Sequence, residues 1–571
     1  MFIPNRFIHP DVSPEFMKLH IPDLTKDLWP LISTFKSWVA TLNRLYETRT
    51  RLRRAESMIV FILLSLVWGW ILVFSGSLTS GFHLLDDHEI ISMSHQMQSS
   101  TDDFGTIMSG WVKRDLNKRF RPIYYVHRII EAKLFGGNLF LWSCYHGVLA
   151  LLTSYLLYLF CRLNSTSSFF SLVFPFVALI GPQVQIWWCL GPAEVPGIFL
   201  FSLSLVLVFL AARSAVSVGV WKPIFVLTIV LMSLCKESFI LLIPFFAILF
   251  VALSGSCVEG QWRELAKRTA FVTFALTLIF LAEISVILFV VGTSGEGYAG
   301  VDRFNLIGDV QNLFAWSMGP PFNGIILCAL ASILVNIVAW GVKSRHASDF
   351  WQIVRDVLQR ISFALLIIIP QVVLYSKSGL FYSYYLPITL GFSLLLYPML
   401  HSPTGPSIIS RVLIFLCIVA MVLPNLKWSY GAARYFAVQG EDINSALMEV
   451  RYSTQADTPI LIVADPAFQF EQAYSLKTNL NIVQERRNLY IDTVLTVSEY
   501  NGFQRSLIQG FGGLFNPPQW IDDFHGPNRI GCIIVFPNAE SAFLKQRLSW
   551  FGTAGYRRHK YENFILYLKN C

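Results

Sequence analysis

The sequence predicts a polytopic α-helical membrane protein with about eleven spanning helices and a C-terminal extracytoplasmic α/β domain. Only 14% of the 571 residues are charged, whereas about a quarter is usual for a soluble protein. The uncharged residues gather in runs of roughly 16–24 residues, the length that crosses a bilayer as a helix. Beyond residue 427 the pattern changes to short apolar runs separated by polar turns, which indicates a small α/β domain.

The first spanning segment is predicted at residues 58–75, a run without charge. Its distance from the N-terminus excludes the apolar region of a cleavable signal peptide. The preceding RTRLRR, residues 49–54, is strongly basic and predicts that residues 1–57 form a cytoplasmic N-terminal segment. Within this segment, apolar residues recur at helical spacing over residues 21–45, which indicates an amphipathic helix at the membrane surface or in the cytosol.

Further spans follow a first external loop at residues 77–137 and complete a transmembrane domain over residues 58–426. They are predicted near residues 138–160, 166–181, 195–212, 222–235, 238–254, 269–292, 323–342, 361–376, 385–400 and 412–426. The short loops predicted to be cytoplasmic are the richest in basic residues, namely Arg162, Arg213, Lys222, Arg263, Lys267, Arg268, Lys343, Arg345, Arg355, Arg360 and Arg411. Apart from the first loop, the pattern follows the positive-inside rule, and an odd number of spans places the C-terminal domain outside.

The C-terminal domain, residues 427–571, has the pattern of alternating strands and helices. The predicted strands are TPILIVAD (458–465), RIGCIIVFPN (529–538) and NFILYLK (563–569), and AESAFLKQRLSWF (539–551) is the predicted helix. The nine cysteines of the chain include no CxxC pair and no zinc-site spacing. No basic patch with interleaved aromatic residues points to nucleic acid as a partner.

An acidic cluster lies just beyond the first span. The stretch FHLLDDHEI, residues 82–90, contains Asp86, Asp87, His88 and Glu89 in a row. A carboxylate at a membrane boundary can deprotonate a hydroxyl, bind a metal, relay protons or simply hydrate a loop. Neighbouring carboxylates raise each other's pKa, which suits a general base when they are partly buried. A divalent metal remains an open alternative, although contiguous residues seldom converge on one ion.

The first external loop continues into a segment that is predicted to be helical. Pro122 is suited to the first position of a helix, and Arg119 and Arg121 precede it. The residues that would form one apolar face are Ile123, Val126, Ile129, Ile130 and Leu134. This pattern is typical of a helix along the membrane surface, and packing against the spans is the alternative.

Polar residues at further external boundaries are candidates for ligand binding. In SLCKESFI (233–240), Lys236 and Glu237 interrupt an apolar stretch, either as an ion pair in a turn or with Lys236 bound to an anionic group such as phosphate. In YSKSGLFYSYYLP (375–387), Lys377 stands beside Tyr384 and Tyr385. Trp188 in WWCLGPAE (187–194) has a similar position. Such aromatic residues form an ordinary interfacial belt or contact a ligand.

Together these motifs resemble the GT-C superfamily of membrane glycosyltransferases. The matching features are the acidic pair Asp86–Asp87, then Arg121–Pro122–Ile123–Tyr124, and the turn Leu134–Phe135–Gly136–Gly137–Asn138. Cys235–Lys236–Glu237 is similar to a motif of protein O-mannosyltransferase relatives, and YYLP (384–387) is similar to a boundary motif of the wider superfamily. The resemblance covers about residues 58–400, and it extends to families like the lipid A aminoarabinose transferases.

The resemblance implies a mechanism and a set of partners. Members take a sugar from a polyprenyl-phosphate donor at the external face and usually invert the anomeric centre. No cofactor is assigned to this chain, and a divalent metal stays an alternative. Asp86 or Asp87 would be the base, with Asp86 slightly favoured. Four cations would bind the donor phosphate, namely Arg121, Lys236, Arg119 and Lys377. Candidates for contact with the acceptor or the sugar are His88, Glu89, Glu237, Tyr384, Tyr385 and Trp188.

Two departures from the family pattern limit what the resemblance implies. The C-terminal region has no tetratricopeptide repeat, so protein O-mannosylation is not implied. A basic residue often precedes YLP in the superfamily, whereas Ser383 or Tyr384 stands there in this chain. The implied acceptor is a glycan, lipid or protein of the cell envelope, and the implied location is the bacterial inner membrane.

Two alternatives belong to other functional classes. A transporter or flippase of lipid-linked sugars would be expected to have charges in mid-span and two related halves, and the sequence contains no such repeat. In a non-catalytic envelope-assembly protein, the C-terminal domain would be the working part.

Overall fold

The structure is a computed structural model, and it describes a large part of the chain. The described residues are 51–117, 119–164, 168–213, 219–255, 262–292, 307–308, 310–311, 315, 331, 347–375, 385–395, 408–465, 469–493, 530–551 and 555–569. The chain divides into two compact units, residues 1–63 and residues 64–571. In the first unit, the described residues belong to helix α2 (Arg51–Ser75), and all contacts given below lie within the second unit.

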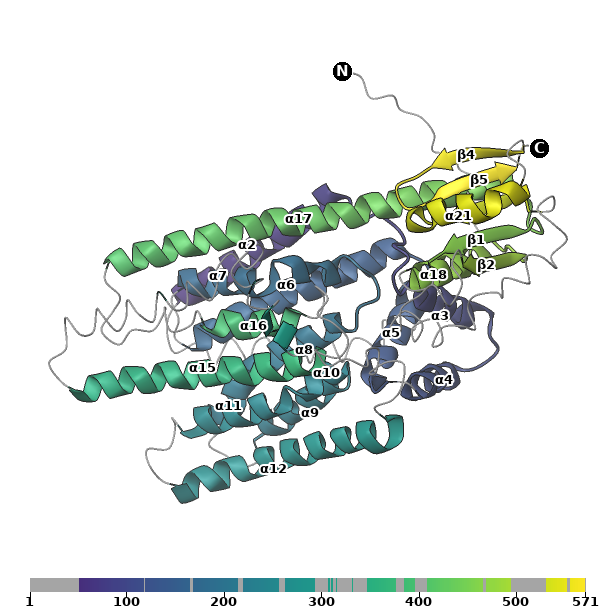
Figure 1. The fold of residues 1–571 in the computed structure, drawn as a ribbon. Coiled ribbons are helices and arrows are strands. Elements are labelled where there is room, and N and C mark those ends of the chain that lie inside the picture. Colours follow the sequence, from purple (N-terminus) through teal and green to yellow (C-terminus); the bar gives the residue numbers. More distant parts are fainter. Residues whose placement is uncertain are drawn as a thin grey trace. The chain divides into compact units, whose positions relative to one another are not determined.

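Helices make up most of the second unit (Figure 1). After α2 come three helices of the first predicted external loop, α3 (Asp87–Ser99), α4 (Phe104–Leu116) and α5 (Pro122–Phe135). The next elements are α6 (Leu139–Leu163), α7 (Ser168–Leu179), η2 (Pro182–Trp187), α8 (Glu194–Arg213), α9 (Trp221–Ser233), α10 (Glu237–Ile240), α11 (Ile243–Gly255), α12 (Trp262–Val286), η3 (Ile287–Val291), α15 (Ala347–Tyr375), α16 (Tyr385–Leu395) and α17 (Ile408–Ser453).

The predicted membrane class is confirmed, but the number of spans is not. Among the described residues, five helices are long and apolar enough to cross a membrane: Ala55–Ser75, Leu139–Leu163, Glu194–Arg213, Glu237–Gly255 and Trp262–Val291. Trp221–Ser233 and Ile361–Tyr375 are shorter apolar helices. The span predicted near 323–342 lies outside the described residues except for residue 331, and the amphipathic segment at 21–45 lies wholly outside them.

Burial separates central helices from peripheral ones. Helix α8 packs against α6, α9 and α11, and nearly all of its residues from Val195 to Ala212 are buried. This is expected of a helix that is apolar on all sides. Helix α12 instead exposes Phe274, Leu278 and Leu281, as a helix in contact with lipid does.

Helix α5 begins at Pro122, as predicted, and buries its polar face. Arg128 and Glu131 are each only 2% exposed, and Arg128 Nη1 donates a hydrogen bond of 3.0 Å to Glu131 Oε2. In contrast, Ile130 is 43% exposed and Leu134 is 47% exposed. The apolar face therefore does not pack fully against the protein, and this favours contact with the membrane surface.

The C-terminal strands form a five-stranded sheet in the part that the structure describes, in the order β2-β1-β3-β5-β4. The strands are β1 (Ile460–Ala464), β2 (Leu489–Thr493), β3 (Cys532–Val535), β4 (Tyr556–Lys560) and β5 (Ile565–Lys569). Strand β1 is parallel to β2 and β3, whereas β5 is antiparallel to β3 and β4. The three predicted strands are confirmed as β1, β3 and β5, and the predicted helix is α21 (Pro537–Phe551).

The two faces of the sheet have separate apolar cores. Ile460 and Ile462 of β1 pack with Leu476 of α18 (Phe470–Ile482) and with the end of α17. Leu461 and Val463 lie in the core that contains α21. This alternation is the two-residue period of a strand covered on both faces.

Helix α17 connects the C-terminal domain to the end of α2. It has 46 residues and continues through the domain boundary predicted at residue 427. Arg434 Nη1 donates to the carbonyl oxygen of Ser75 at 3.1 Å, and Ser77 Oγ donates to that of Ala433 at 3.0 Å. Further along α17, Gly440 lies against the backbone of Ser80, where a Cβ atom would overlap the carbonyl group.

We expect Gly440→Ala to destabilise the protein, since the new methyl group must displace the Ser80 backbone. Overpacking of this kind typically costs about 1–3 kcal/mol. The matched control is Gly431→Ala on the same helix, because a Cβ atom there would meet nothing within 4 Å. The control should be neutral or stabilising by up to about 1 kcal/mol, since alanine favours a helix. Thermal unfolding of the purified variants checks this, and equal midpoints for the two variants would contradict the assigned contact.

Candidate active site

The acidic cluster lies where the chain passes from α2 into α3. Leu84 and Asp86 have φ angles of 60° and 57°, in the left-handed region. Residues other than glycine seldom adopt this conformation, and they keep it where the surrounding structure holds them. The turn sends the side chains of Asp86 and Asp87 into different surroundings.

Asp87 is fully buried, and its Oδ2 atom accepts hydrogen bonds from the backbone N–H groups of His83 (2.7 Å) and Leu84. Its Oδ1 atom has no hydrogen-bond partner among the described residues. Burial raises the pKa of Asp87 to about 7, although the two backbone donors oppose this shift. The side chain closes the turn that precedes α3.

Asp86 is only partly buried and lies between the helices and the C-terminal domain. Its side chain packs against Gly191, where an added Cβ atom would overlap it. Its backbone N–H donates to Glu471 Oε1 of α18 at 2.7 Å. Residues from the loop before α8 and from α18 thus enclose Asp86.

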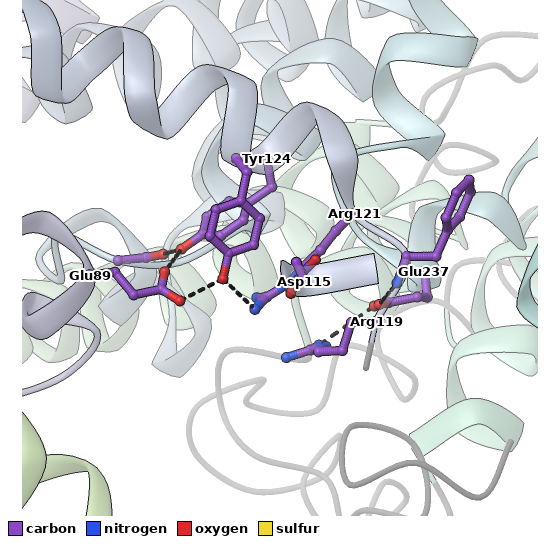
Figure 2. Close-up of polar contacts among 9 residues, drawn as sticks. Glu89, Asp115, Arg119, Arg121, Tyr124 and Glu237 are labelled. Carbon is purple, nitrogen blue, oxygen red and sulfur yellow. Dashed lines mark hydrogen bonds and ion pairs between the residues drawn. The ribbon is translucent and has the colours of Figure 1, made fainter. Parts of the chain in front are cut away.

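His88 and Glu89 face different neighbours. His88 Nδ1 is 3.0 Å from Ser475 Oγ, and the His88 ring lies 4.7 Å from the ring of Tyr474. Glu89 accepts hydrogen bonds from the hydroxyl groups of Tyr124, at 3.1 Å, and Tyr125 (Figure 2).

Glu89 is held as a carboxylate by its neighbours. Burial alone would raise its pKa, but the Arg121 guanidinium and the Tyr125 hydroxyl outweigh burial, so that the pKa lies below the usual value. Glu89 therefore accepts hydrogen bonds at neutral pH and does not donate one.

Arg121 lies between acidic and aromatic side chains. Its Nε atom is 3.1 Å from Asp115 Oδ1, and its Nη2 atom donates to the Tyr125 hydroxyl at 3.2 Å. The guanidinium carbon is 4.8 Å from the centre of the Tyr124 ring. Burial raises the pKa of Asp115 to about 6, and Arg121 opposes this shift.

Arg119 and the Lys236 hairpin belong to the same region. Arg119 Nη2 is 3.5 Å from Glu237 Oε2, and the backbone N–H of Phe120 donates to Glu237 Oε1 at 3.0 Å (Figure 2). The Ile123 N–H also donates to the Leu234 carbonyl oxygen at 3.0 Å. These contacts join the start of α5 to the α9–α10 hairpin.

Lys236 forms a buried ion pair with Glu194, the first residue of α8. The two side chains are 7% and 6% exposed. Lys236 Nζ is also 5.8 Å from the centre of the Tyr375 ring. Lys236 and Glu237 therefore each have a partner of opposite charge from another segment of the chain, Glu194 and Arg119 respectively.

The loop before α8 connects the acidic and the basic residues. The Tyr124 hydroxyl oxygen also lies 2.9 Å from the Gly191 carbonyl oxygen, so its single proton is shared between this carbonyl group and Glu89. Burial raises the pKa of the Cys189 thiol, and the carboxyl groups of Asp87, Asp86, Glu471 and Glu194 add to this shift. Carboxyl groups from three separate segments of the chain, at residues 86–87, 194 and 471, therefore contribute to the raised pKa of Cys189.

Trp188 forms part of the aromatic packing in this loop. Its ring lies 5.8 Å from that of Trp68 of α2, and the ring of Trp187 lies 5.9 Å from Trp68. All three rings are buried, so Trp188 supports the loop from the side of the first span.

The structure brings together most of the residues singled out in the sequence. They are Asp86, Asp87, His88, Glu89, Arg119, Arg121, Trp188, Lys236 and Glu237. Lys377 and Tyr384 lie outside the described residues, and Tyr385 is the first residue of α16. Within the described ranges, no group of three or more His, Cys, Asp or Glu side chains is placed to hold a metal ion.

Three residues of the site were missed in the sequence. Asp115 and Tyr125 lie in the same loop as Arg121, and a search for partners of each basic residue would have identified Asp115. Glu471 lies 385 residues from Asp86, and no motif marks it. Only the tertiary structure shows that α18 packs against α3.

Comparisons with known proteins give matches among solved structures alone. No family model and no curated protein matches the chain. Among solved structures, it is similar to ArnT from Cupriavidus metallidurans, both bound to undecaprenyl phosphate and in the apo state. The TM-score is 0.47 with each, the identities are 12% and 13%, and the match covers 89% of this chain and 97% of ArnT. This similarity is too low to carry an argument about function, so the function is inferred from this chain's own residues.

We expect Asp87→Ala to lose about 1–3 kcal/mol of stability, because the His83 and Leu84 N–H groups lose their acceptor. Asp87→Asn keeps an acceptor oxygen and should be milder. The raised pKa of Asp87 means that its protonated form stabilises the fold at low pH, and that this contribution is lost as the pH rises from 3.8 through about 7.

Thermal unfolding as a function of pH checks both expectations. The midpoint of the wild type should fall relative to that of Asp87→Asn over this pH range. A constant difference between the two proteins, or an Asp87→Ala variant as stable as Asp87→Asn, would contradict the assigned role.

Proposed function

We propose that the chain is a GT-C-type glycosyltransferase that moves a sugar from a polyprenyl-phosphate donor to a hydroxyl group at the external face of the membrane. One observation carries the proposal. A partly exposed carboxylate, Asp86, shares one end of the apolar helices with three cations, Arg119, Arg121 and Lys236. A base for the acceptor and cations for a phosphate are the two chemical requirements of this reaction.

Asp86 is the residue that we assign as the base. Asp87 is enclosed, and one of its oxygen atoms already accepts two backbone hydrogen bonds. Asp86 is only partly buried. An acceptor hydroxyl can therefore approach Asp86 more readily than Asp87.

The cations are assigned to the donor phosphate. Each is paired with a carboxylate, namely Arg119 with Glu237, Arg121 with Asp115, and Lys236 with Glu194. Buried cations require such partners to offset the loss of hydration. A phosphate group that binds between these cations would share them with the carboxylates. Arginine suits this role because its guanidinium group can donate two parallel hydrogen bonds to a phosphate.

The proposed reaction is a single displacement. The acceptor oxygen attacks the anomeric carbon on the face opposite the phosphate, and its proton moves to Asp86. The bond between the anomeric carbon and the phosphate oxygen breaks, and both bonding electrons leave with the polyprenyl phosphate. The cations stabilise the negative charge on this leaving group. The product has an inverted anomeric centre.

The remaining assignments follow the same scheme. Residues 58–426 would form the transmembrane domain and residues 427–571 the extracytoplasmic domain, in a bacterial inner membrane with the N-terminus in the cytoplasm. His88, Glu89, Glu237 and Trp188 would surround the sugar or the acceptor. The acceptor would be a cell-envelope glycan, lipid or protein, brought to Asp86 beside the C-terminal domain.

The position of one intramembrane carboxyl group argues against the transporter alternative. Glu283 lies within the apolar helix Trp262–Val291, and its Oε1 atom accepts a hydrogen bond of 2.8 Å from Ser233 Oγ. Ser233 is the last residue of α9 and lies three residues before Lys236, so this contact is at the hairpin end of α9. A transport pathway would be expected to place such a group at mid-membrane.

We expect Asp86→Asn to lower sugar transfer about 10²–10⁴-fold, since the amide cannot accept the acceptor proton. Transfer is measured in membranes with a panel of radiolabelled undecaprenyl-phosphate-linked sugars, and donor binding is measured separately. Binding should be retained. The matched control is Asp102→Asn, an exposed acid of the same loop, which should keep full transfer. Full transfer by a folded Asp86→Asn variant would refute the proposed function.

We expect the double variant Lys236→Met/Glu194→Gln to bind undecaprenyl phosphate roughly ten- to a hundredfold more weakly. A hydrogen bond to a charged group contributes about 1.5–3 kcal/mol, and about 1.4 kcal/mol is one factor of ten. Both charges are removed together because a single change would leave a buried charge unpaired. Lys113→Gln, an exposed change in α4, is the control. Unchanged binding by the double variant, measured at constant salt, would exclude Lys236 from the phosphate site.

A further inference from the structure

Helix α18 of the C-terminal domain supplies side chains to the acidic cluster. It packs against α3 and contacts β1 and β2 on its other sides. Ser475 and Tyr474 contact His88, and Glu471 contacts Asp86. The C-terminal domain therefore forms part of the site, because one of its carboxyl groups, that of Glu471, contacts the proposed base.

Glu471 and Asp86 make two contacts. Glu471 Oε1 accepts the Asp86 backbone N–H at 2.7 Å. This contact brings the two carboxyl groups close enough to interact with each other through their side chains. Carboxylates are hydrogen-bond acceptors only, so a hydrogen bond between the two side chains requires a proton on one of them.

The proton is assigned to Glu471. Burial and the negative charge of Asp86 raise the pKa of Glu471 well above its usual value. Titratable groups lie on each element around the pair. They are Asp86, Asp87, His88 and Glu89 at the start of α3, Cys189 and Glu194 in the loop before α8, Tyr474 and Lys477 on α18, Asp465 after β1, Tyr490 and Asp492 on β2, and Glu441, Asp442, Glu449 and Arg451 on α17. Of these groups, Asp86 and Asp87 both act to keep Glu471 protonated.

We propose that Glu471 is a positioning residue for the base: its protonated carboxyl group donates a hydrogen bond to the Asp86 carboxylate and also accepts the Asp86 N–H. This inference rests on the proposed function, since it presumes that Asp86 receives the acceptor proton. The proton of Glu471 stays on Glu471 throughout the reaction. The acceptor proton moves to Asp86 and then to water, so the charge balance of the displacement is unchanged.

Two consequences follow for the reaction. The Asp86 carboxylate is held in one orientation, which raises the fraction of encounters that lead to proton transfer. Activity also depends on the protonated form of Glu471, because its ionisation would place two carboxylates against each other. Transfer should therefore decline on the alkaline side, as the pH rises through the raised pKa of Glu471.

The test compares Glu471→Gln with Glu471→Ala in the full-length protein. Glutamine resembles the protonated acid, since its amide can donate to Asp86 and its oxygen can accept the Asp86 N–H. Glu471→Gln should keep transfer near neutral pH and lose the alkaline decline. Glu471→Ala should lose at least about tenfold in kcat with a smaller change in KM, in the range of lost positioning. Glu562→Gln, an exposed change in the same domain, is the control.

A second measurement needs no substrate. A carboxyl group with a raised pKa stabilises the fold below its usual pKa, and this contribution is lost as the pH rises through the raised value. The thermal midpoint of the wild type should therefore fall with pH relative to that of Glu471→Gln. A constant difference between them would overturn the assignment of the proton.

The outcomes separate this inference from the function on which it rests. Loss of transfer in Asp86→Asn together with wild-type transfer in Glu471→Ala would overturn the role of Glu471 alone. Glu471→Gln as inactive as Glu471→Ala would also overturn it, because the ionised form would then be required. Full transfer in Asp86→Asn would instead overturn the proposed function.

Discussion

The buried ion pair between Lys236 and Glu194 is the interaction on which the site depends. A lysine at the end of an apolar helix bundle requires a carboxylate close by, and loss of one partner from such a pair costs about 3–5 kcal/mol. Glu194 is the first residue of α8, and Lys236 lies in the hairpin between α9 and α10. The next residue, Glu237, pairs with Arg119 and accepts the Phe120 N–H. The need to neutralise charge therefore also determines how the hairpin, the start of α8 and the first loop come together.

Two adjacent carboxylates have different surroundings because of the backbone between them. Asp86 has a left-handed φ and stands just before α3, whereas Asp87 is the first residue of that helix. Asp87 turns inward and accepts backbone N–H groups, and Asp86 lies against Gly191 and Glu471. Asp86 and Asp87 are adjacent residues of the same type, so their sequence alone does not distinguish them. The local backbone conformation makes Asp87 an enclosed acid that closes a turn and leaves Asp86 able to meet a substrate.

Much of the fold could be predicted because apolar runs report the length and burial of each element. The strands β1, β3 and β5 and the start of α5 at Pro122 were correct. Strand β4 was missed because it is polar, and β2 was missed because its apolar run is only three residues long. Among the site residues, the cations and acids were found as charges near membrane boundaries. The pairing of Lys236 with Glu194 and of Arg119 with Glu237 was not, since these contacts join segments that are distant in the sequence. Glu471 is the clearest case, because it is an ordinary helical glutamate until α18 packs against α3.

The C-terminal domain is connected to the acidic turn by two independent routes. Helix α18 contacts Asp86 and His88 directly. Helix α17 runs from Ile408 to Ser453, and its Asn444 Nδ2 donates to the Ser80 carbonyl oxygen at 3.4 Å, while Ser80 Oγ lies 2.9 Å from His83 Nε2. A shift of the domain would therefore move both ends of the turn that presents Asp86. If this domain receives the acceptor, its binding energy acts on the position of the base as well, and acceptor recognition and proton transfer become parts of one step.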